Sequence, residues 1–257
     1  MSLVTDIAMV RGWLAGPARV CVLTGSGVSA ESKIPTFRTA VENQLDTHQD
    51  ARALWADFDP MKLATAEAFA ANPEMVTRWY DWRRVKCMAA VPNLGHLALA
   101  ELEVSLEARG GSFTLLTQNV DGLHQRAGSR DVVELHGSIM TWRGVRTGRP
   151  FELPEDELTD FPPAFDDGEL ARPGVVWFGE ALPETALVAA FAAIESCDVF
   201  LSIGTSAVVY PAAGFADLAH QHGARIVEVN PEATPITGRV DVALAGKSGL
   251  ILPRIVG

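Results

Sequence analysis

The stretch "VLTGSGVSAESKIPTFR" (22–38) overlaps the end of an apolar run, "RVCVLT" (19–24). Gly25, Gly27 and Ala30 form the pattern G-x-G-x-x-A where a predicted strand gives way to a helix. Glycines there permit a tight turn and let backbone N–H groups approach a pyrophosphate at a helix start. A plain glycine turn would give the same pattern, so the rest of the chain has to decide between the two interpretations.

Further apolar runs follow the first and are separated by helical patterns. They are "FTLLT" (113–117), "DVVEL" (131–135), "DVFLSIG" (198–204) and "ARIVEVN" (224–230). A helical stripe of Leu3, Ile7, Val10 and Leu14 precedes them, and "ELEVSLEARG" ends a helix with Gly110 or Gly111 as its cap. Buried strands separated by helices predict an α/β protein with a Rossmann-like parallel sheet covered on both faces.

Two stretches interrupt this alternation. Residues 41 to about 95 are mostly helical in pattern, whereas residues 139–174 are rich in proline and acid and show no clear period. We interpret both as insertions that form a smaller lobe. The larger lobe would comprise about 1–40, 96–138 and 175–257, so that one catalytic domain spans 1–257.

The chain carries 32 acidic and 21 basic residues and a net charge of −11. An acidic surface repels phosphate backbones, so we expect no nucleic-acid partner. The apolar runs are too short to span a bilayer and Met1–Gly16 lacks a signal-peptide pattern, so we expect no membrane partner. Three scattered cysteines form neither a disulfide framework nor a CxxC pair, which favours a cytoplasmic location.

The acidic residue that usually follows a Rossmann loop is missing. A second strand ending in an acid for the ribose should come about 20 residues later, but a polar loop follows instead. The comparable polar cluster comes late, at "VEVNPE" (227–232). A hydride-transferring dehydrogenase is therefore disfavoured, and we expect the nucleotide at the loops after the first, fourth and fifth strands.

Six blocks of this sequence, in this order, resemble the sirtuins. They are "GSGVSAESKIPTFR", "TQNVDGLHQRAGS", "ELHGS", "RPGVVWFGE", "IGTSAVVYPAA" and "VNPE", and the resemblance runs from about Val20 to Pro253. It implies an NAD-dependent protein-lysine deacylase. Such an enzyme acts on acylated lysine in proteins or peptides, transfers the acyl group to ADP-ribose and releases nicotinamide. Sirtuins have a large Rossmann-like domain and a small lobe of two insertions, which matches the organisation predicted above.

The same resemblance places the NAD contacts on loops that follow the predicted strands. The pyrophosphate would lie at Gly25, Ser26 and Gly27, the nicotinamide ribose beside Phe37 and Arg38, and the ribose and carboxamide pocket at Gln118, Asn119 and Asp121. Phosphate and ribose contacts would come from Gly204, Thr205 and Ser206, the adenosine ribose contacts from Asn230 and Glu232, and the adenine contact from Ser248.

His136 in "ELHGS" matches the catalytic base of the family, and Asn119 is assigned to the reaction beside it. The implied chemistry is attack of the acyl oxygen on C1′ of the ribose as nicotinamide leaves. A base then takes a proton from the ribose hydroxyls. Imidazole, with an ordinary pKa of about 6.5, suits that task at neutral pH. By contrast, His124 lies in a helical turn, "GLHQRAG", and is predicted to pack or cap.

Most sirtuins carry a zinc ribbon of two CxxC pairs in the small lobe. The matching positions here are Gly144, Thr147, Ala164 and Asp167, and residues 139–174 contain no Cys or His. Structural zinc requires four such ligands, so we expect no metal. We interpret Asp166, Asp167 and Glu169 as solvated loop acids, and expect the lobe to be held by packing of Trp142, Phe151, Leu153, Phe161 and Phe165. Lys33, where the family usually has glycine, is a smaller departure.

The segment "RWYDWRRVK" places Tyr80 and Arg83 three residues apart on one helix face. Taken alone, the pair is better explained as an amphipathic surface turn. With "LWADFDPMKLATAEAFAANP" before it, the segment resembles the sirtuin subgroup that removes negatively charged acyl groups such as succinyl and malonyl. There, Tyr and Arg bind the acyl carboxylate, and a small residue, here Ala68, widens the pocket.

The segment "VVWFGE" (175–180) is expected to present a strand edge to the substrate peptide. The substrate contacts would be Val176, Trp177, Phe178, Gly179 and Glu180.

Two other functions remain open at this point. One is ADP-ribosyl transfer or NAD hydrolysis in the same pocket, and the other is a catalytically weak NAD-binding protein. Intact His136, Asn119 and Asp121 argue against the weak binder. Tyr80 and Arg83 argue against the first, which needs no site for an acyl carboxylate. Nothing in the sequence indicates an oligomeric state.

Overall fold

The computed structural model describes residues 2–34 and 60–257. Its strands are β1 (Arg19–Thr24), β2 (Ser112–Thr117), β3 (Val132–Glu134), β4 (Gly137–Gly144), β5 (Pro150–Phe151), β6 (Ala171–Val175), β7 (Val199–Ile203), β8 (Arg225–Asn230) and β9 (Val242–Ala245). Its helices are α1 (Leu3–Leu14), α2 (Ser26–Ser29), η1 (Ala30–Ser32), α4 (Pro60–Leu63), α5 (Ala66–Ala71), α6 (Pro73–Ala89), α7 (Leu94–Ala108), α8 (Leu123–Arg126), α9 (Glu184–Ser196), η3 (Ala212–Gly214), α10 (Phe215–Gln221) and α11 (Ser248–Val256). Within these ranges no helix combines the length and the apolar character needed to cross a bilayer.

The larger sheet has six strands in the order β3-β2-β1-β7-β8-β9, and every neighbouring pair is parallel. The parallel sheet expected from the apolar runs is confirmed, since those runs coincide with β1, β2, β3, β7 and β8. The outermost strand, β9, is not evident from the sequence. Its four residues alternate between buried and exposed positions and so form no continuous apolar run.

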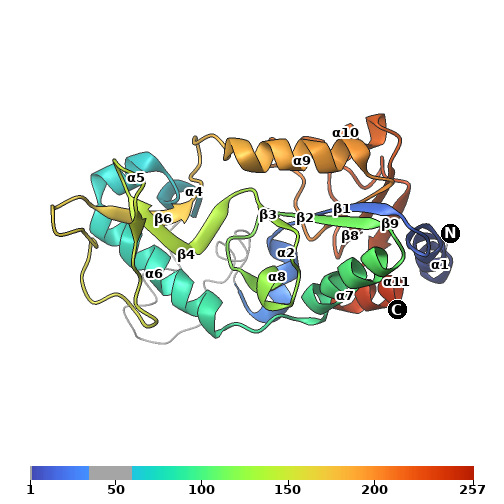
Figure 1. The fold of residues 1–257 in the computed structure, drawn as a ribbon, viewed down its shortest axis with the longest axis horizontal. Coiled ribbons are helices and arrows are strands. Elements are labelled where there is room, and N and C mark those ends of the chain that lie inside the picture. The colour runs from blue at the N-terminus through green and yellow to red at the C-terminus, as the bar shows by residue number, and fades with distance from the viewer. Residues whose placement is uncertain (1, 35–59) are drawn as a thin grey trace.

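Helices cover both faces of this sheet, with α9 and α10 on one side and α1, α7 and α11 on the other (Figure 1). The side chains of β1 alternate between the two layers, as the period of a strand requires. Val20 and Val22 belong to the core cluster shared with α1, α7 and α11. Cys21 and Leu23 belong to the cluster shared with α9 and α10. The central strand is therefore buried on both faces, as its uninterrupted apolar sequence predicts.

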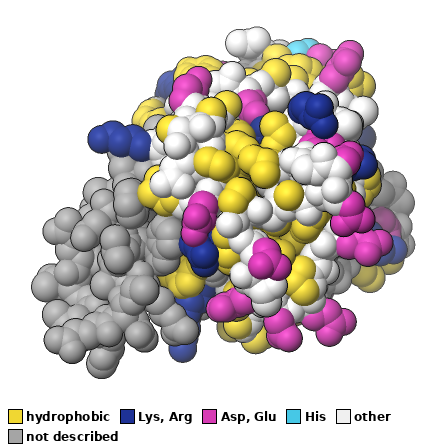
Figure 2. Space-filling model, turned by 90° about the vertical axis from the view of Figure 1, so that its left-hand side faces the viewer, with side chains coloured by type: hydrophobic (Ala, Val, Ile, Leu, Met, Phe, Trp, Pro, Cys, Tyr) yellow, Lys and Arg dark blue, Asp and Glu magenta, His cyan; other side chains and the backbone are white. Residues whose placement is uncertain are grey.

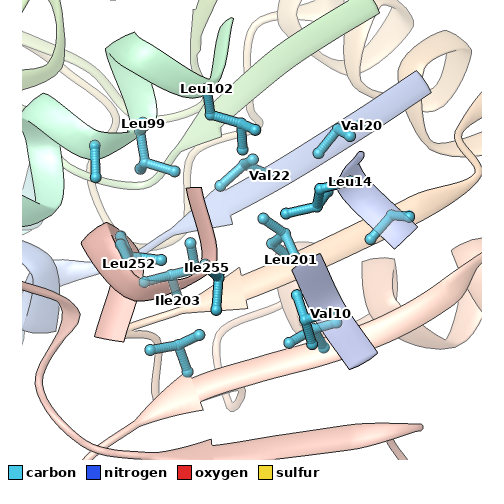
Figure 3. Packing of buried hydrophobic residues seen from close by; sticks show 14 of the residues in the cluster. Val10, Leu14, Val20, Val22, Leu99, Leu102, Leu201, Ile203, Leu252 and Ile255 are labelled. Atoms are coloured by element: carbon cyan, nitrogen blue, oxygen red, sulfur yellow. The ribbon is translucent and has the colours of Figure 1, made fainter. Parts of the chain in front are cut away.

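The cluster beneath α7 and α11 joins segments that are distant in sequence. Val22, Leu201 and Ile203 from β1 and β7 lie beside Leu99 of α7 and Leu252 of α11 (Figure 3). All five side chains are fully buried. Apolar burial contributes about 25 cal/mol per Å², so this layer is a main source of the stability that keeps the strand ends in place.

A second sheet has three antiparallel strands in the order β5-β4-β6. Together with α4, α5 and α6 it lies at the end of the molecule opposite α1 and α11 (Figure 1). The register of β4 against β6 shifts between Ser138 and Trp142. That irregularity interrupts the two-residue period within β4, and most of residues 145–170 lie outside any strand, so residues 139–174 appear patternless in sequence. The lobe boundaries given above remain a prediction.

Apolar packing joins this second sheet to α5 and α6. Trp142 lies in the shared cluster, and Phe151, Leu153 and Phe165 pack against it, as expected. Phe161 is not part of this cluster, and its ring instead lies 4.4 Å from the guanidinium carbon of Arg78 on α6. Viewed from this end, Asp and Glu side chains line the lower and right margins of a central hydrophobic area (Figure 2).

Two helices follow the sequence closely. In α1, Ile7, Val10 and Leu14 face the core. Gly110 follows α7 with φ +77°, a left-handed conformation that favours glycine and ends the helix.

We expect Leu99→Ala to lower the free energy of unfolding by about 2–5 kcal/mol, because it opens a cavity in a fully packed core. Val104→Ala on the same helix is the matched control, since Val104 is 57% exposed, and its effect should stay within about 0.5 kcal/mol. Urea titration of both variants measures the difference. Equal effects would show that the cluster does not stabilise the sheet.

Candidate active site

The loops that follow β1, β2, β7 and β8 meet at one edge of the large sheet, because parallel strands end on the same side. The loop after β1 lies directly on the loop after β7. The N–H of Gly25 donates to the carbonyl of Ile203 (3.1 Å), and that of Gly27 donates to the carbonyl of Gly204 (2.8 Å). A Cβ on Gly25 would lie 2.8 Å from Cα of Thr205, and one on Gly27 would lie 2.7 Å from the Gly204 carbonyl oxygen. Backbone contact alone therefore requires glycine at both positions.

A buried network links the end of β2 to this glycine loop. The side-chain amide of Asn119 donates to the carbonyl of Gly25 and to the hydroxyl of Ser29, both at 3.1 Å. Ser29 in turn donates to the carboxylate of Asp121 at 2.7 Å. The structure thus brings Asn119 and Asp121 together and adds Ser29, which the sequence analysis does not single out. In the sequence, only its position as a hydroxyl residue just after the glycine loop could have indicated Ser29.

Asp121 is a buried carboxylate with defined partners. Burial raises its pKa, whereas the hydrogen bonds from the Leu123 N–H and the Ser29 hydroxyl oppose that shift. The charges of Arg83 and Arg126 oppose it as well. These interactions hold the Asp121 side chain in one orientation at the end of β2.

His136 is half-buried and lies between β3 and β4. Its Nδ1 is 3.0 Å from the carbonyl oxygen of Gln118. A carbonyl can only accept, so Nδ1 carries the proton and donates it, and the lone pair of the neutral ring is at Nε2. Burial lowers the pKa of His136, and the hydrogen bond to Gln118 offsets part of that effect. The ring is therefore neutral at pH 7 and competent as a base at Nε2.

Thr205 connects three of the four loops. The side-chain amide of Gln118 donates to its hydroxyl at 3.1 Å, and the side-chain amide of Asn230 donates to its carbonyl at 2.8 Å. Ser206 and Glu232, the other predicted residues of these loops, are exposed at the same edge. The predicted phosphate and ribose residues therefore lie on adjacent loops.

Three further residues, Ser248, Phe37 and Arg38, are also predicted to contact NAD. Ser248 is buried, and its hydroxyl donates to the carboxylate of Glu31 at 3.1 Å. That same carboxylate accepts the Gly249 N–H at the start of α11, at 2.8 Å. Phe37 and Arg38 lie outside the described residues.

His124 has a structural role, as expected. It is 1% exposed, its Nε2 lies 3.0 Å from the Thr24 hydroxyl, and its ring centre lies 4.8 Å from that of His96. Burial lowers the pKa of His124 to about 3 and that of His96 to about 4. Both rings are therefore neutral at pH 7 and pack against each other behind the site.

The strand edge expected over 175–180 is not continuous, because β6 ends at Val175. Beyond it, the N–H of Val176 donates to the carbonyl of His136 and that of Phe178 to the carbonyl of Ala64, both at 2.9 Å. Gly179 then has φ +86°, a left-handed turn that a strand cannot accommodate. The segment is thus a loop held against His136 on one side and α4 on the other.

Glu180 is expected to face the substrate, yet its carboxylate is engaged within the chain. It accepts hydrogen bonds from Nη1 and Nη2 of Arg172 at 2.5 and 3.0 Å and from the Trp177 N–H at 2.9 Å. The guanidinium carbon of Arg172 lies 3.3 Å from the centre of the Trp177 ring. Arg172, which the sequence analysis does not single out, therefore fixes the shape of residues 175–180.

Tyr80 and Arg83 are both buried on α6, at 5% and 9% exposure, which rules out a surface turn. Burial raises the pKa of Tyr80 while the Arg83 charge opposes that shift, and burial lowers the pKa of Arg83. The Arg83 guanidinium carbon lies 4.9 Å from the Trp79 ring centre. Ala68 on α5 packs, half-buried, against the cluster that contains Tyr80 and Trp177.

We expect a double-mutant cycle of Arg172→Met and Glu180→Gln to give a coupling of about 1–2 kcal/mol in urea unfolding. The pair is bidentate and Arg172 is buried, although Glu180 is partly exposed. The control is the surface pair Glu74–Arg78, one turn apart on α6, where about 0.3–0.5 kcal/mol is expected. Equal coupling free energies for the two pairs would show that Arg172 does not fix the shape of the loop.

Known proteins match both the sequence and the fold. The Sir2 family model matches residues 25–211. The chain is 50% identical over 228 residues to the NAD-dependent protein deacylase of Thermus thermophilus, covering 88% of this chain and 84% of that protein. A solved structure of a Sir2 homolog–NAD complex is similar with a TM-score of 0.84 and 42% identity, covering 97% of this chain and 92% of that one. A structure of Sir2 bound to acetylated peptide gives 0.79 and 28%, covering 99% and 97%. With residues 25–211 matched by the family model and 50% identity over 228 residues to a curated deacylase, the chain belongs to the Sir2 family.

Proposed function

We propose that this NAD-dependent protein deacylase removes acidic acyl groups, such as succinyl and malonyl, as well as acetyl from lysine side chains in proteins or peptides. Nicotinamide and O-acyl-ADP-ribose would be the products. Family membership and the similarity to a curated deacylase support the activity. The buried pair on α6 supports the acidic acyl groups.

The side chains at the carboxyl edge of the sheet suit NAD. Gly25 and Gly27 keep the first loop narrow, and we assign the pyrophosphate to that loop. The amides of Gln118 and Asn119 are suited to a carboxamide and ribose hydroxyls, so we assign the nicotinamide end to them. The adenosine end is assigned to the loops after β7 and β8, with Ser248 nearby. Phe37 and Arg38 stay part of this proposal by resemblance.

NAD, when bound, would supply an electrophilic ribose carbon, C1′, with nicotinamide as its leaving group. His136 would take a proton from a ribose hydroxyl at Nε2, because its Nδ1 proton is held by the Gln118 carbonyl. Asn119 is fixed by Gly25 and Ser29 and would orient the reactive end of the cofactor. Pre-oriented polar groups of this kind lower the barrier because they need no rearrangement during the reaction.

The observation that carries the acyl preference is the joint burial of Tyr80 and Arg83. Burial removes water from the Arg83 guanidinium, so an anionic group beside it would stabilise its charge more than it would in solvent. The planar guanidinium can also donate two parallel hydrogen bonds to a carboxylate. Its charge acts on both Tyr80 and Asp121. Tyr80 also has a side-chain hydrogen bond with Trp177, so we assign the acyl carboxylate to this pair, near both Asp121 and residues 175–180.

Residues Val176 to Gly179 are the proposed peptide contacts. The loop is held by its own backbone N–H groups, which bond to His136 and Ala64. Glu180 would act indirectly, through Arg172 and Trp177, because its carboxylate is already engaged. This differs from the strand-edge contact expected from the sequence, although backbone recognition of an extended peptide still fits.

We expect Arg83→Met to lower kcat/KM for a succinyl-lysine peptide by about 10- to 150-fold, the equivalent of one charge-assisted hydrogen bond. Turnover of the matched acetyl-lysine peptide should change by no more than a few-fold, because acetyl carries no carboxylate. Arg78→Met is the control, since Arg78 is an exposed arginine on the same helix. Product masses from both peptides provide the measurement.

The outcome separates two explanations. A loss confined to succinyl-lysine supports a carboxylate site at Arg83. Equal losses for both peptides would reject that site and make Arg83 structural, while leaving the deacylase activity in place.

We expect His136→Ala to lower acyl transfer by about 10²- to 10⁴-fold while NAD binding persists. Because the pKa of His136 is lowered, wild-type activity should persist as the pH falls below the usual histidine pKa and decline only at the lower pKa of His136. His220→Ala, an exposed histidine on α10, is the control. If His136→Ala transferred acyl groups at the wild-type rate, or if its activity declined at low pH as the wild-type activity does, His136 would not be the base. Consumption of NAD without acyl transfer by the wild-type protein would instead indicate hydrolysis or ADP-ribosyl transfer.

A further inference from the structure

The small sheet has no ligand set for the zinc that the sirtuin resemblance implies. The four matching positions carry Gly144, Thr147, Ala164 and Asp167, which offer one carboxylate and no thiolate or imidazole. Among the residues that the structure describes, no group of three or more His, Cys, Asp or Glu could hold a metal ion. Structural zinc requires four such ligands in a closed shell, so these residues do not fit it.

A different side chain occupies the space between these positions. Glu169, expected to be solvated, is instead buried, with its side chain 1% exposed. Its Oε1 accepts the N–H of Arg146 at 2.7 Å and that of Thr147 at 2.8 Å. The Thr147 hydroxyl bonds to both carboxylate oxygens, at 3.1 and 2.9 Å, and Nε of Arg149 lies 3.3 Å from Oε2. The expectation of a solvated acid is wrong because the turn after β4 closes over the Glu169 carboxylate.

The second pair of positions is joined to the same group. The N–H of Glu169 donates to the Asp167 carboxylate at 3.1 Å, and its carbonyl accepts the N–H of Phe165 at 2.8 Å. Arg149 completes the link, because its Nη2 lies 2.6 Å from Asp167 and its guanidinium carbon lies 3.9 Å from the Phe165 ring centre. Residues 144–149 and 164–169 are thus connected through one carboxylate and one guanidinium.

We propose that the Glu169 carboxylate, with Thr147 and Arg149, takes the structural place of the zinc ion in this protein. A ribbon zinc joins two short turns by accepting electron pairs from both. Here the carboxylate accepts hydrogen bonds from the turn after β4, and the backbone of its own residue holds the loop before β6. The charge of Arg149 balances the buried carboxylate, as a buried charge requires.

Gly144 provides an independent observation for this assignment. A Cβ at that position would lie 2.6 Å from Oε1 of Glu169 and 2.8 Å from the Thr147 hydroxyl. A side chain at position 144 would therefore displace the Glu169 carboxylate from its present position. The glycine at this position leaves the space that the carboxylate occupies.

The electrostatics agree with this geometry. Burial alone would raise the pKa of Glu169, but the hydrogen bonds from Thr147 and Arg146 and the charge of Arg149 outweigh it, so that the pKa is lowered. A carboxyl group whose pKa is lowered by folding stabilises the folded state above its unfolded pKa, and that contribution is lost as the pH falls through the folded value. The pKa of Asp167 is lowered as well, first by the hydrogen bond from the Glu169 N–H.

The test is hydrogen exchange on the whole protein, which compares the small sheet with the large one. We expect Glu169→Gln to speed amide exchange in β4 and β6 by at least about tenfold while β1 and β2 are unchanged, since local opening is a property of the affected unit. Gly144→Ala is a second, milder variant that should act in the same direction by displacing the carboxylate. Asp166→Asn, an exposed acid three residues from Glu169, is the matched control and should change neither sheet.

Metal analysis and a chelator complete the experiment. The wild-type protein should contain well under one equivalent of zinc, and EDTA should leave exchange in β4 and β6 unchanged. Stoichiometric zinc whose removal speeds exchange there would overturn the proposal, as would variants at 144 and 169 that exchange like the control. The readout involves no acyl peptide, so the result is independent of the proposed acyl preference.

Discussion

The contact between the loop after β1 and the loop after β7 is the constraint on which the site depends. Gly25 and Gly27 lie against Gly204 and Thr205 with no room for a Cβ on either glycine. Gly204 has φ +59°, and a Cβ there would lie 2.6 Å from the Val28 nitrogen. Three side-chain amides then bond to these two loops, from Asn119, Gln118 and Asn230. Glycine at these positions therefore allows the ends of four strands to form one surface.

The two histidines after β2 differ in burial, which separates the packing role of His124 from the catalytic role proposed for His136. His124 lies behind the network, with its ring against His96 and a pKa of about 3. His136 is only half-buried and has its Nδ1 proton directed at a backbone carbonyl. Burial lowers the pKa of both rings, but the first is fully enclosed, whereas the second is partly exposed and has its ring oriented by the Gln118 carbonyl at the end of β2. Residue type is the same, and solvent access makes the difference.

The small sheet connects the proposed substrate contacts to a cluster at its far end. β4 begins directly after His136, and β6 ends directly before the loop that contains Trp177. At the other end of the same two strands, Glu169 bonds the turn after β4. The Arg172–Glu180 pair holds the near end. The buried carboxylate of Glu169 and the buried guanidinium of Arg172, each paired with an oppositely charged side chain, therefore hold the two ends of a sheet for which the sirtuin resemblance implies a zinc ion.

The sequence by itself determined the fold class, five strands of the large sheet, the family resemblance and, for most of the described site residues, the strand end or helix near which they lie. These are properties of consecutive residues, such as an apolar run, a glycine spacing or a motif. Only the tertiary structure decided which polar groups are buried and what they bond to. Ser29 and Asp121 meet across 92 positions and Glu169 reaches back 22 positions to Thr147. A glutamate in an acidic stretch resembles a solvated one until the fold closes a turn over it, because desolvation depends on neighbours that are distant in the chain.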